Sequence, residues 1–428
     1  MTDLLIVAAR AIAAWMLPLS MIPLLIWFER KGAAFIQDRT GPNRASILGV
    51  RLGGIVHNFA DVVKLITKED ITPAHVNRFF FVLAPMIAMT VALLTVAVIP
   101  LADTIVIGDR AIPAQAAPIS PGILYILAIS SFSVYSIVLA GWASNNSYSL
   151  LGGIRASAQM ISYELTMGLS VVGMIMIFGT FDLNEMVRGQ SGEILGVLPK
   201  WGIFLQPVAF LLFLTSAFAE TNRNPFDLPE GESEIVGYHV EYSSMKFALF
   251  FMAEYAHIVV AAAVTATLFF GGWQVPYLST EELRAHAHVL VPASFALIAV
   301  AGIAIFVLSR RYSRMLHRMY RDLRSKEAEL YTVVAAALVV GGIAGAALTF
   351  SGRLPDWAPA VFALVAQIGA FSVKLIALTF LFIWVRWTLP RFRYDQLMNL
   401  GWKGMLPLAL ANIVGTAVAL LLIEGARR

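Results

Sequence analysis

The chain has 428 residues, of which 59% are hydrophobic and only 14% are charged, with a formal net charge of +4 and a mean hydropathy of +0.76. An average soluble domain is roughly 25% charged, so this composition excludes water as the solvent for most of the surface. The absence of cysteine excludes disulfides, thiolate-bound iron–sulfur clusters and cysteine nucleophiles on this chain. Neither a G-x-G-x-x-G segment after a strand-like run nor a P-loop is present, so nicotinamide binding and ATP hydrolysis are not supported.

The first apolar run starts close to the N-terminus. An acidic residue, Asp3, precedes the run, which ends at Glu29, Arg30 and Lys31 with no small-residue cleavage pattern before these charges. A secretory signal peptide has a basic start and such a cleavage site. We therefore expect an uncleaved first membrane span.

Ten apolar runs predict an all-α integral membrane protein, because a helix needs roughly 20 apolar residues to cross a hydrocarbon core of about 30 Å. Lysine and arginine concentrate in residues 29–78, 310–330 and 386–403. These three loops fall on one side when ten spans alternate. Basic loops stay cytoplasmic, so we expect both termini on the opposite, periplasmic side. The alanine-rich composition favours a bacterial source, so the expected location is the bacterial inner membrane. The runs are 4–28, 79–101, 122–141, 155–179, 203–219, 246–270, 289–309, 331–350, 358–387 and 404–424.

Two cytoplasmic segments are expected to be helices that do not span. Residues 53–67 place their apolar side chains near one helical face, which predicts an amphipathic helix lying in the membrane interface. Residues 310–330 alternate charge too densely for hydrocarbon and predict a basic helix at the lipid surface. The apolar side chains of the first segment are Ile55, Phe59, Val62, Val63 and Ile66, and the polar ones away from that face are His57, Asp61 and Lys64.

An acidic loop, ETNRNPFDLPEGESE at 220–234, is the most informative stretch. A cytoplasmic loop of this sign is unusual, and carboxylates that lie close together raise one another's affinity for protons, which suits a proton relay. A structural alternative is that Asp227 caps a helix whose first turn holds Pro229, with Glu230 completing a capping box. A purely solvated loop is a further alternative. Residues 220–241 contain one arginine, Arg223, and six acids: Glu220, Asp227, Glu230, Glu232, Glu234 and Glu241.

Charged residues also occur inside the apolar runs. Glu164, Glu254 and Lys374 lie within the fourth, sixth and ninth runs. An isolated charge at mid-bilayer costs roughly 2.5–3.5 kcal/mol on insertion scales, so such groups usually face a polar cavity. Each could instead snorkel or pack, but together with Glu220 at a span end they outline a possible proton path.

Two weaker patterns carry no functional prediction. His286 and His288 lack nearby acids, so no metal site is expected. Gly341 and Gly345 have the small-x-x-x-small spacing, which predicts close helix packing.

Six motifs in order along the chain resemble one known family, the membrane subunit of respiratory complex I that forms the quinone tunnel, called the H subunit in bacteria and subunit 1 in mitochondria. The resemblance covers about 1–275 and 358–424. The motifs are ERKGAAFIQDRTGPNR at 29–44, FADVVKLITKED at 59–70, GGIRASAQMISYEL at 152–165, ETNRNPFDLPEGESE at 220–234, EYSSMKFALFFMAEY at 241–255 and FIWVRWTLPRFRYDQLMNLGWK at 382–403.

The resemblance implies eight core helices with an interfacial helix after the first. It also implies a subunit of a proton-pumping NADH:quinone oxidoreductase, in which ubiquinone or menaquinone enters a tunnel and is reduced near an iron–sulfur cluster on a partner. FMN and the iron–sulfur clusters would belong to partner subunits only. The implied partners are the quinone-site and terminal iron–sulfur subunits of the hydrophilic arm, small membrane subunits, antiporter-like subunits and membrane lipids, with no nucleic acid.

The resemblance also assigns roles to residues that match the family's motifs. No catalytic or metal-binding residue is expected on this chain. The tunnel residues are Arg30, Arg44, Phe59, Asp61, Lys64, Arg223 and Phe226. The acids of the proton path are Glu29, Glu164, Glu220, Glu230, Glu232, Glu234 and Glu254. The loop that docks the hydrophilic arm contains Arg386, Arg391, Arg393 and Asp395.

One long segment departs from the family pattern, which usually has a short loop after Trp273. We therefore expect three parts: core helices in 1–275, an inserted transmembrane hairpin with a basic cytoplasmic segment in 276–355, and two last core helices with the docking loop in 356–428. A second departure is Ser147, where many bacterial relatives have a lysine.

Two other functions remain open at this point. The membrane subunit of an energy-converting hydrogenase shares parts of the acidic loop but needs no quinone, whereas the GPNR and FADVVKL segments favour the quinone enzyme. A proton-coupled transporter usually has an inverted repeat with broken helices, and the sequence has no such repeat.

Overall fold

The computed structural model describes residues 2–427 except 48, 108–109, 195, 229, 232–235, 320–326, 352–354 and 356. Within these residues, nine helices are long and apolar enough to cross a membrane, and a tenth apolar helix is shorter. All ten predicted runs are helical, which confirms the all-α fold. The long helices are α1 (Thr2–Ile36), α3 (Arg78–Thr95), α4 (Gly122–Ala143), α5 (Ser147–Phe178), α9 (Ser244–Phe269), α11 (Ala287–Met319), α12 (Glu327–Ser351), α13 (Ala358–Thr388) and α15 (Leu406–Arg427).

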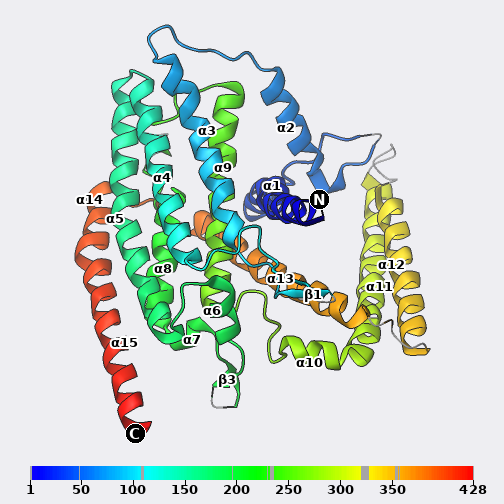
Figure 1. The fold of residues 1–428 in the computed structure, drawn as a ribbon. Coiled ribbons are helices and arrows are strands. Elements are labelled where there is room, and N and C mark those ends of the chain that lie inside the picture. Colours follow the sequence, from blue (N-terminus) through cyan, green and yellow to red (C-terminus); the bar gives the residue numbers. More distant parts are fainter. Residues whose placement is uncertain are drawn as a thin grey trace. The chain divides into compact units, whose positions relative to one another are not determined.

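The chain divides into two compact units. The larger unit contains Met1–Ile22, Leu65–Tyr277 and Gln367–Arg428, and the smaller one contains Pro23–Lys64 and Leu278–Ala366. In the larger unit, α3 packs on α4 and α9, and α5 packs on α4, α8 (Pro207–Glu220) and α15. These helices form the bundle that Figure 1 shows around α9.

Close packing of α4 on α5 depends on glycine. A Cβ on Gly141 would lie 2.6 Å from the carbonyl oxygen of Ser149, and one on Gly153 would lie 3.2 Å from that of Ile137. Small residues of this kind let helix backbones approach closely in membranes. Helix α5 begins after Asn146, whose side chain accepts a hydrogen bond from the Tyr148 amide at 3.0 Å. The helix therefore starts eight residues before the apolar run at 155.

The run at 203–219 is broken into α7 (Gly202–Leu205) and α8. Gln206 lies between them with φ −138° and ψ 62°, and Pro207 begins α8. Proline suits this position because the first helical residue needs no amide donor. The Gln206 side chain donates to Thr416 at 2.7 Å and accepts from Asn412 at 2.9 Å, so α15 supplies polar partners at the break.

The last span joins three helical pieces. Helix α14 (Tyr394–Asn399) passes through a π-helical turn (Leu400–Met405) into α15. At this turn the Trp402 indole donates to the Ser162 hydroxyl at 3.0 Å. The π-helical turn is thereby held against α5.

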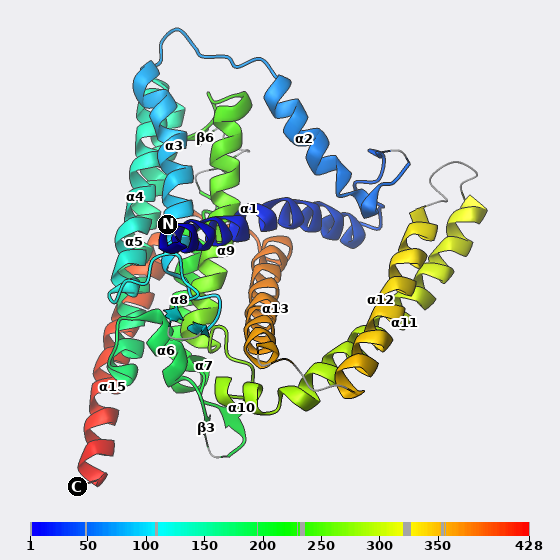
Figure 2. The same cartoon turned by 45° about the vertical axis from the view of Figure 1, so that its right-hand side comes forward.

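In the smaller unit, α11 and α12 pack together along their length as a helical hairpin (Figure 2). A Cβ on Gly342 would lie 2.7 Å from the Phe295 carbonyl oxygen, and one on Gly345 would lie 2.5 Å from the Phe295 ring. A Cβ on Gly341 would meet nothing within 4 Å. The predicted packing pair is therefore wrong in one member, since Gly342 rather than Gly341 lies at the contact.

The basic segment at 310–330 differs from the expected separate surface helix. Residues 310–319 continue α11, and 320–326 lie outside the described residues. No glycine or proline occurs from 303 to 340, so nothing in the sequence interrupts helical propagation after the apolar part. The hairpin is preceded by α10 (Thr280–Ala285), which Ser279 and Glu282 cap reciprocally.

The predicted helix at 53–67 is present as a 3₁₀ turn, Leu52–Gly54, followed by α2 (Val56–Thr67). Its apolar residues Phe59, Val62, Val63 and Ile66 are exposed. An exposed apolar face of this kind suits contact with lipid or a partner, and the interfacial location stays a prediction.

The strands that the structure describes form three short antiparallel hairpins in the connecting loops. They are β1 (Ile105–Ile107) with β2 (Arg110–Ile112), β3 (Glu193–Ile194) with β4 (Leu198–Pro199), and β5 (Glu230–Gly231) with β6 (Val236–Gly237).

Candidate functional site

The first part of the acidic loop is fixed against α5 by a buried amide. Gln159 donates to the carbonyl oxygens of Ala219 and Phe226, both at 2.7 Å, and it is fully buried. The Phe226 ring packs edge-on against Tyr163 with ring centroids 5.4 Å apart. Residues 219–226 are therefore held in one position by polar and aromatic contacts.

The predicted docking loop packs on this same stretch. Arg391 donates to the Asp227 carboxylate at 2.8 Å, and the Phe392 amide donates to the Pro225 carbonyl at 3.0 Å. Asn224 donates to the Leu389 carbonyl at 3.0 Å. Asp227 therefore forms an ion pair, and the alternative in which it caps a helix is wrong.

Of the remaining proton-path acids predicted in this loop, the structure describes only one. Glu230 begins β5, paired with Gly237 of β6. Glu232 and Glu234 lie outside the described residues. In the docking loop, the Arg386 carbonyl accepts from Asn224 at 3.2 Å, and Arg393 pairs with Asp395 at 3.0 Å.

A buried ion pair joins the acidic loop to α9. Arg223 lies 3.4 Å from the Glu254 carboxylate, and it lies over the Tyr255 ring at 4.3 Å. The Tyr238 hydroxyl donates to the other oxygen of Glu254 at 2.8 Å. The ion pair and this hydrogen bond give both carboxyl oxygens of Glu254 a partner, in a site where an isolated polar group would be costly.

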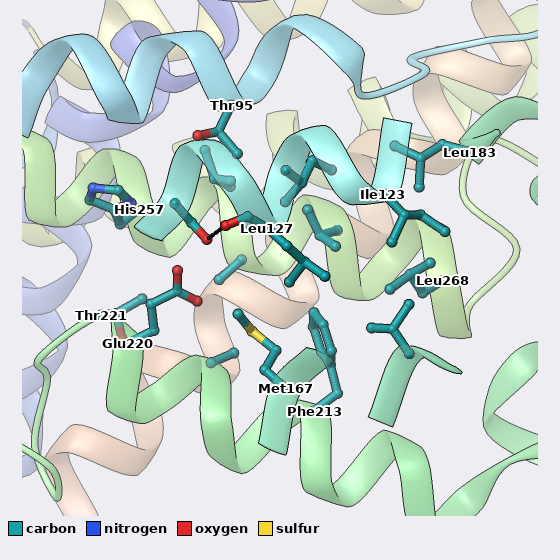
Figure 3. Close-up of a pocket in the computed structure, with 17 residues that line it drawn as sticks. Thr95, Ile123, Leu127, Met167, Leu183, Phe213, Glu220, Thr221, His257 and Leu268 are labelled. Carbon is teal, nitrogen blue, oxygen red and sulfur yellow. Dashed lines mark hydrogen bonds between the residues drawn. The ribbon is translucent and has the colours of Figure 1, made fainter. Parts of the chain in front are cut away.

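A cavity of about 40 Å³ lies among α3, α4, α5, α6 (Leu183–Gly189), α8 and α9. Figure 3 shows Glu220, Thr221, His257 and Thr95 at one end, and Ile123, Leu183, Phe213 and Leu268 at the other. Polar residues therefore lie at one end of a cavity whose lining is otherwise apolar. Its volume is enough to hold water.

Glu164 and Glu220 are connected through two adjacent serines of α4. The Ser131 hydroxyl donates to the Glu164 carboxylate. The Ser130 hydroxyl donates to the Leu127 carbonyl at 3.1 Å, and Ser130 lines the cavity with Glu220. Two of the predicted proton-path acids are thereby brought together.

The third charged residue of the spans, Lys374, has a structural explanation. Its ammonium donates to the carbonyl oxygens of Gly272 at 2.9 Å and Gln274 at 2.7 Å, just beyond the end of α9. It also lies over the Trp201 ring at 4.8 Å. These contacts hold the chain at the end of α9, far along the helix from Glu254.

The smaller unit contains a second group of predicted residues. Asp61 accepts hydrogen bonds from Arg30 and, at 3.5 Å, from Lys64. Partial burial raises the pKa of Asp61, but the hydrogen bond and charge of Arg30 and the charge of Lys64 outweigh it and hold that pKa below its ordinary value of 3.8. Asp61 therefore stays ionised at neutral pH.

The loop before α2 is fixed by histidine and glycine. The His57 ring accepts from the backbone amides of Arg44 and Ala45, both at 3.0 Å. Gly54 has φ +103°, and a Cβ there would lie 2.1 Å from the Pro42 carbonyl oxygen. Glu29 is half-buried on α1 beside Arg30, and Phe59 is exposed on α2.

The structure thus assembles the predicted residues in two groups. Arg223, Phe226, Glu164, Glu220, Glu254 and the docking loop belong to the larger unit, whereas Glu29, Arg30, Arg44, Phe59, Asp61 and Lys64 belong to the smaller one. Sequence reasoning missed His257, Ser130, Ser131 and Tyr238. The spacing of His257, one helical turn after Glu254, was the available signal. Within the described residues, no three His, Asp or Glu side chains are grouped as metal ligands.

Comparison with known proteins decides the family. A family model described as NADH dehydrogenase matches residues 9–417. The chain belongs to the H-subunit family of NADH-quinone oxidoreductase. It is 43% identical to an H subunit of this enzyme from Solibacter usitatus over 92% of this chain and 91% of that one. It is 41% identical to subunit 8 of Rhodothermus marinus over 94% and 93%, and 39% identical to the H subunit of Bdellovibrio bacteriovorus over 95% and 94%.

These matches confirm the resemblance inferred from the six motifs. Together with the nine long apolar helices within the described residues, they show a multi-pass membrane subunit of NADH-quinone oxidoreductase. The hydrogenase and transporter alternatives lose their support, because the matches cover nearly the whole chain and name the quinone enzyme.

Proposed function

We propose that this subunit forms the quinone-access tunnel of NADH:quinone oxidoreductase, and that its carboxylates couple quinone reduction to proton translocation. Its substrate is a quinone, ubiquinone or menaquinone, while FMN and the iron–sulfur clusters are held by partner subunits. This division of labour agrees with a chain that has no cysteine. The partners are the hydrophilic-arm, small membrane and antiporter-like subunits.

The observation that carries this proposal is the sequence of short steps from the acidic loop into the helix bundle. Arg223 of the loop pairs with Glu254 on α9. Glu220 borders a cavity with α9 and lies beside Ser130, and Ser131 hydrogen-bonds Glu164. Charge that develops near the loop when quinone is reduced would act first on the Arg223–Glu254 pair. Protons then pass between Glu254, Glu220 and Glu164 toward the antiporter-like subunits.

The tunnel part of the proposal rests on the smaller unit and on the loop. Arg30, Asp61 and Lys64 form a charged cluster, and His57 fixes the backbone at Arg44. Arg223 and Phe226 complete the tunnel residues, and Glu29, Glu230, Glu232 and Glu234 extend the acidic path.

The membrane topology is part of the same proposal. The arginines of the docking loop and Asp395 face the hydrophilic arm on the cytoplasmic side, both termini lie in the periplasm, and 276–355 is an inserted hairpin between core regions 1–275 and 356–428. Contact of Arg391 with Asp227 supports a docking loop that is built together with the acidic loop.

Glu220→Gln and Glu254→Gln test the proton path. In complex purified from native membranes and reconstituted in vesicles, each variant should lower inhibitor-sensitive quinone reduction and proton uptake at least fivefold, while NADH:ferricyanide activity at the flavin site is kept. Glu193→Gln, an exposed acid in β3, is the matched control and should retain both activities. Wild-type pumping in both path variants would contradict the proposal.

A further inference from the structure

His257 occupies the polar end of the cavity with Glu220 (Figure 3). The residue is half-buried on α9 and lines this cavity. Within the described part of the chain, neither ring nitrogen has a hydrogen-bond partner. A polar ring without protein partners in a helix bundle is costly unless water bonds to it, so we expect water at its nitrogens.

The surroundings of the cavity can hold that water. The Thr95 hydroxyl donates to the Val91 carbonyl at 2.8 Å, and the Thr221 hydroxyl donates to that of Phe218 at 3.1 Å. Both oxygens can still accept a hydrogen bond from water. With the Glu220 carboxyl and His257, the polar end offers the two to four partners that a buried water needs.

His257 also lies next to Glu254 along α9. Residues three apart on a helix are neighbours, with Cβ atoms about 5–6 Å apart. Glu254 belongs to the loop-facing ion pair and Glu220 to the cavity, and no other described titratable residue lines the cavity besides Glu220 and His257. His257 is therefore the residue that lines the cavity with Glu220 and also lies one helical turn from Glu254.

We propose that His257 is a proton-relay residue that links Glu254 to Glu220 through water in this cavity. The inference rests on the proposed proton path and adds a group to it. One ring nitrogen accepts the proton released by the Glu254 carboxyl. The other nitrogen then releases its proton through water to the Glu220 carboxylate. One proton is moved, and the ring returns to the neutral state as the other tautomer, which ring rotation resets.

The structural alternative is that His257 only fills space between apolar side chains. Val260, one turn further on α9, lines the same cavity and provides the matched control. Val260→Ala enlarges the cavity without removing a titratable group. A packing role predicts similar losses for Val260→Ala and His257 variants, whereas a relay role predicts loss only when the imidazole is removed.

The test uses the whole complex in vesicles, with His257→Gln, His257→Asn and His257→Ala beside Val260→Ala. We expect the amide variants to retain ferricyanide activity but to lose quinone-linked proton uptake at least fivefold, while Val260→Ala stays within twofold of wild type. Added imidazole should restore at least a third of the proton uptake of His257→Ala and should leave the amide variants unchanged.

Three results would overturn the relay. They are wild-type pumping in either amide variant, equal losses in Val260→Ala, and failure of both amide variants to assemble, which would make His257 structural. Glu220→Gln and Glu254→Gln, measured in parallel, separate failure of the His257 relay from failure of the whole proton path. If they lose pumping and the His257 variants do not, only the relay fails. If none loses pumping, the proton path fails with it.

Discussion

The guanidinium of Arg223 lies 3.4 Å from the carboxylate of Glu254, and the two side chains are only 4% and 10% exposed. Removing one member of a buried pair typically costs about 3–5 kcal/mol, because the other charge loses its compensation. We predict that Arg223→Gln lowers the temperature of thermal inactivation of the detergent-solubilised complex, and that the double variant with Glu254→Gln regains part of the loss.

The control for this pair is Arg188→Gln. Arg188 pairs with Asp103 at 2.6 Å, but half of its side chain is exposed, so its loss should cost no more than about 1 kcal/mol. A double variant that is no more stable than Arg223→Gln would show that the two buried charges are not coupled.

Gly54 should be intolerant of any side chain. Gly54→Ala would place a Cβ 2.1 Å from the Pro42 carbonyl oxygen, so the loop that carries Arg44 must move. We predict a severalfold higher KM for a short-chain quinone. Gly53→Ala is the control: Gly53 has φ +63°, but its Cβ would only approach Trp27 at 3.6 Å, leaving backbone strain of about 1 kcal/mol. Equal KM values in the two variants would argue against a tunnel wall here.

Asp61 should contribute nothing to the pH dependence near neutrality. Its pKa is depressed below 3.8 when folded, so the interaction with Arg30 is present above the unfolded pKa of about 3.9 and is lost only as pH falls through the lower folded value. Asp61→Asn should therefore lower inhibitor-sensitive quinone reduction by the same factor at every pH from 6 to 8. A change in the shape of that profile would contradict the prediction.

Lys374 should stabilise the fold without carrying protons. Lys374→Met removes two charged hydrogen bonds to the carbonyls of Gly272 and Gln274, and each such bond contributes about 1.5–3 kcal/mol. We expect the inactivation temperature to fall by several degrees while the number of protons moved per electron is unchanged. A lower proton ratio at full assembly would return Lys374 to the proton path.

The pair of Arg391 with Asp227 should stabilise attachment of the hydrophilic arm. Arg391→Gln and Asp227→Asn each remove the 2.8 Å contact between the docking loop and the acidic loop. We expect a smaller fraction of membrane-arm particles to retain flavin activity on native gels. Arg393→Gln, which loses only an exposed pair with Asp395, should have little effect.

The spans were predictable because hydrophobic length alone identifies helices that cross a bilayer. The breaks and ends of the helices were less predictable. Pro207 is a standard helix start, but the run at 203–219 is apolar on both sides of it, so hydropathy showed no break there. The apolar run that begins at 155 did not reveal that its helix begins after Asn146. The extension of α11 through basic residues was missed because charge density was weighed more heavily than the absence of helix breakers.

The site was predictable in its residue types but not in its pairings. Several acids were identified by their cost in a membrane, but the contact of Arg223 with Glu254 spans 31 residues and depends on how the loop folds. Only its spacing one helical turn after Glu254 distinguished His257 in the sequence, because a single histidine in an apolar run is as common in a packed core as at a functional site. Its position at the cavity emerges only when α3, α4, α5, α6, α8 and α9 are assembled.

The break between α7 and α8 has a consequence for biogenesis. Gln206 is 5% exposed, and its side-chain amide is bonded by Asn412 and Thr416, which are synthesised about two hundred residues later. Until the last helix inserts, this amide either lies unsatisfied in hydrocarbon, at a cost of a few kcal/mol, or must bond to temporary partners. The middle of the bundle is therefore completed by the end of the chain, and premature termination before α15 should produce a subunit that membrane quality control recognises and degrades.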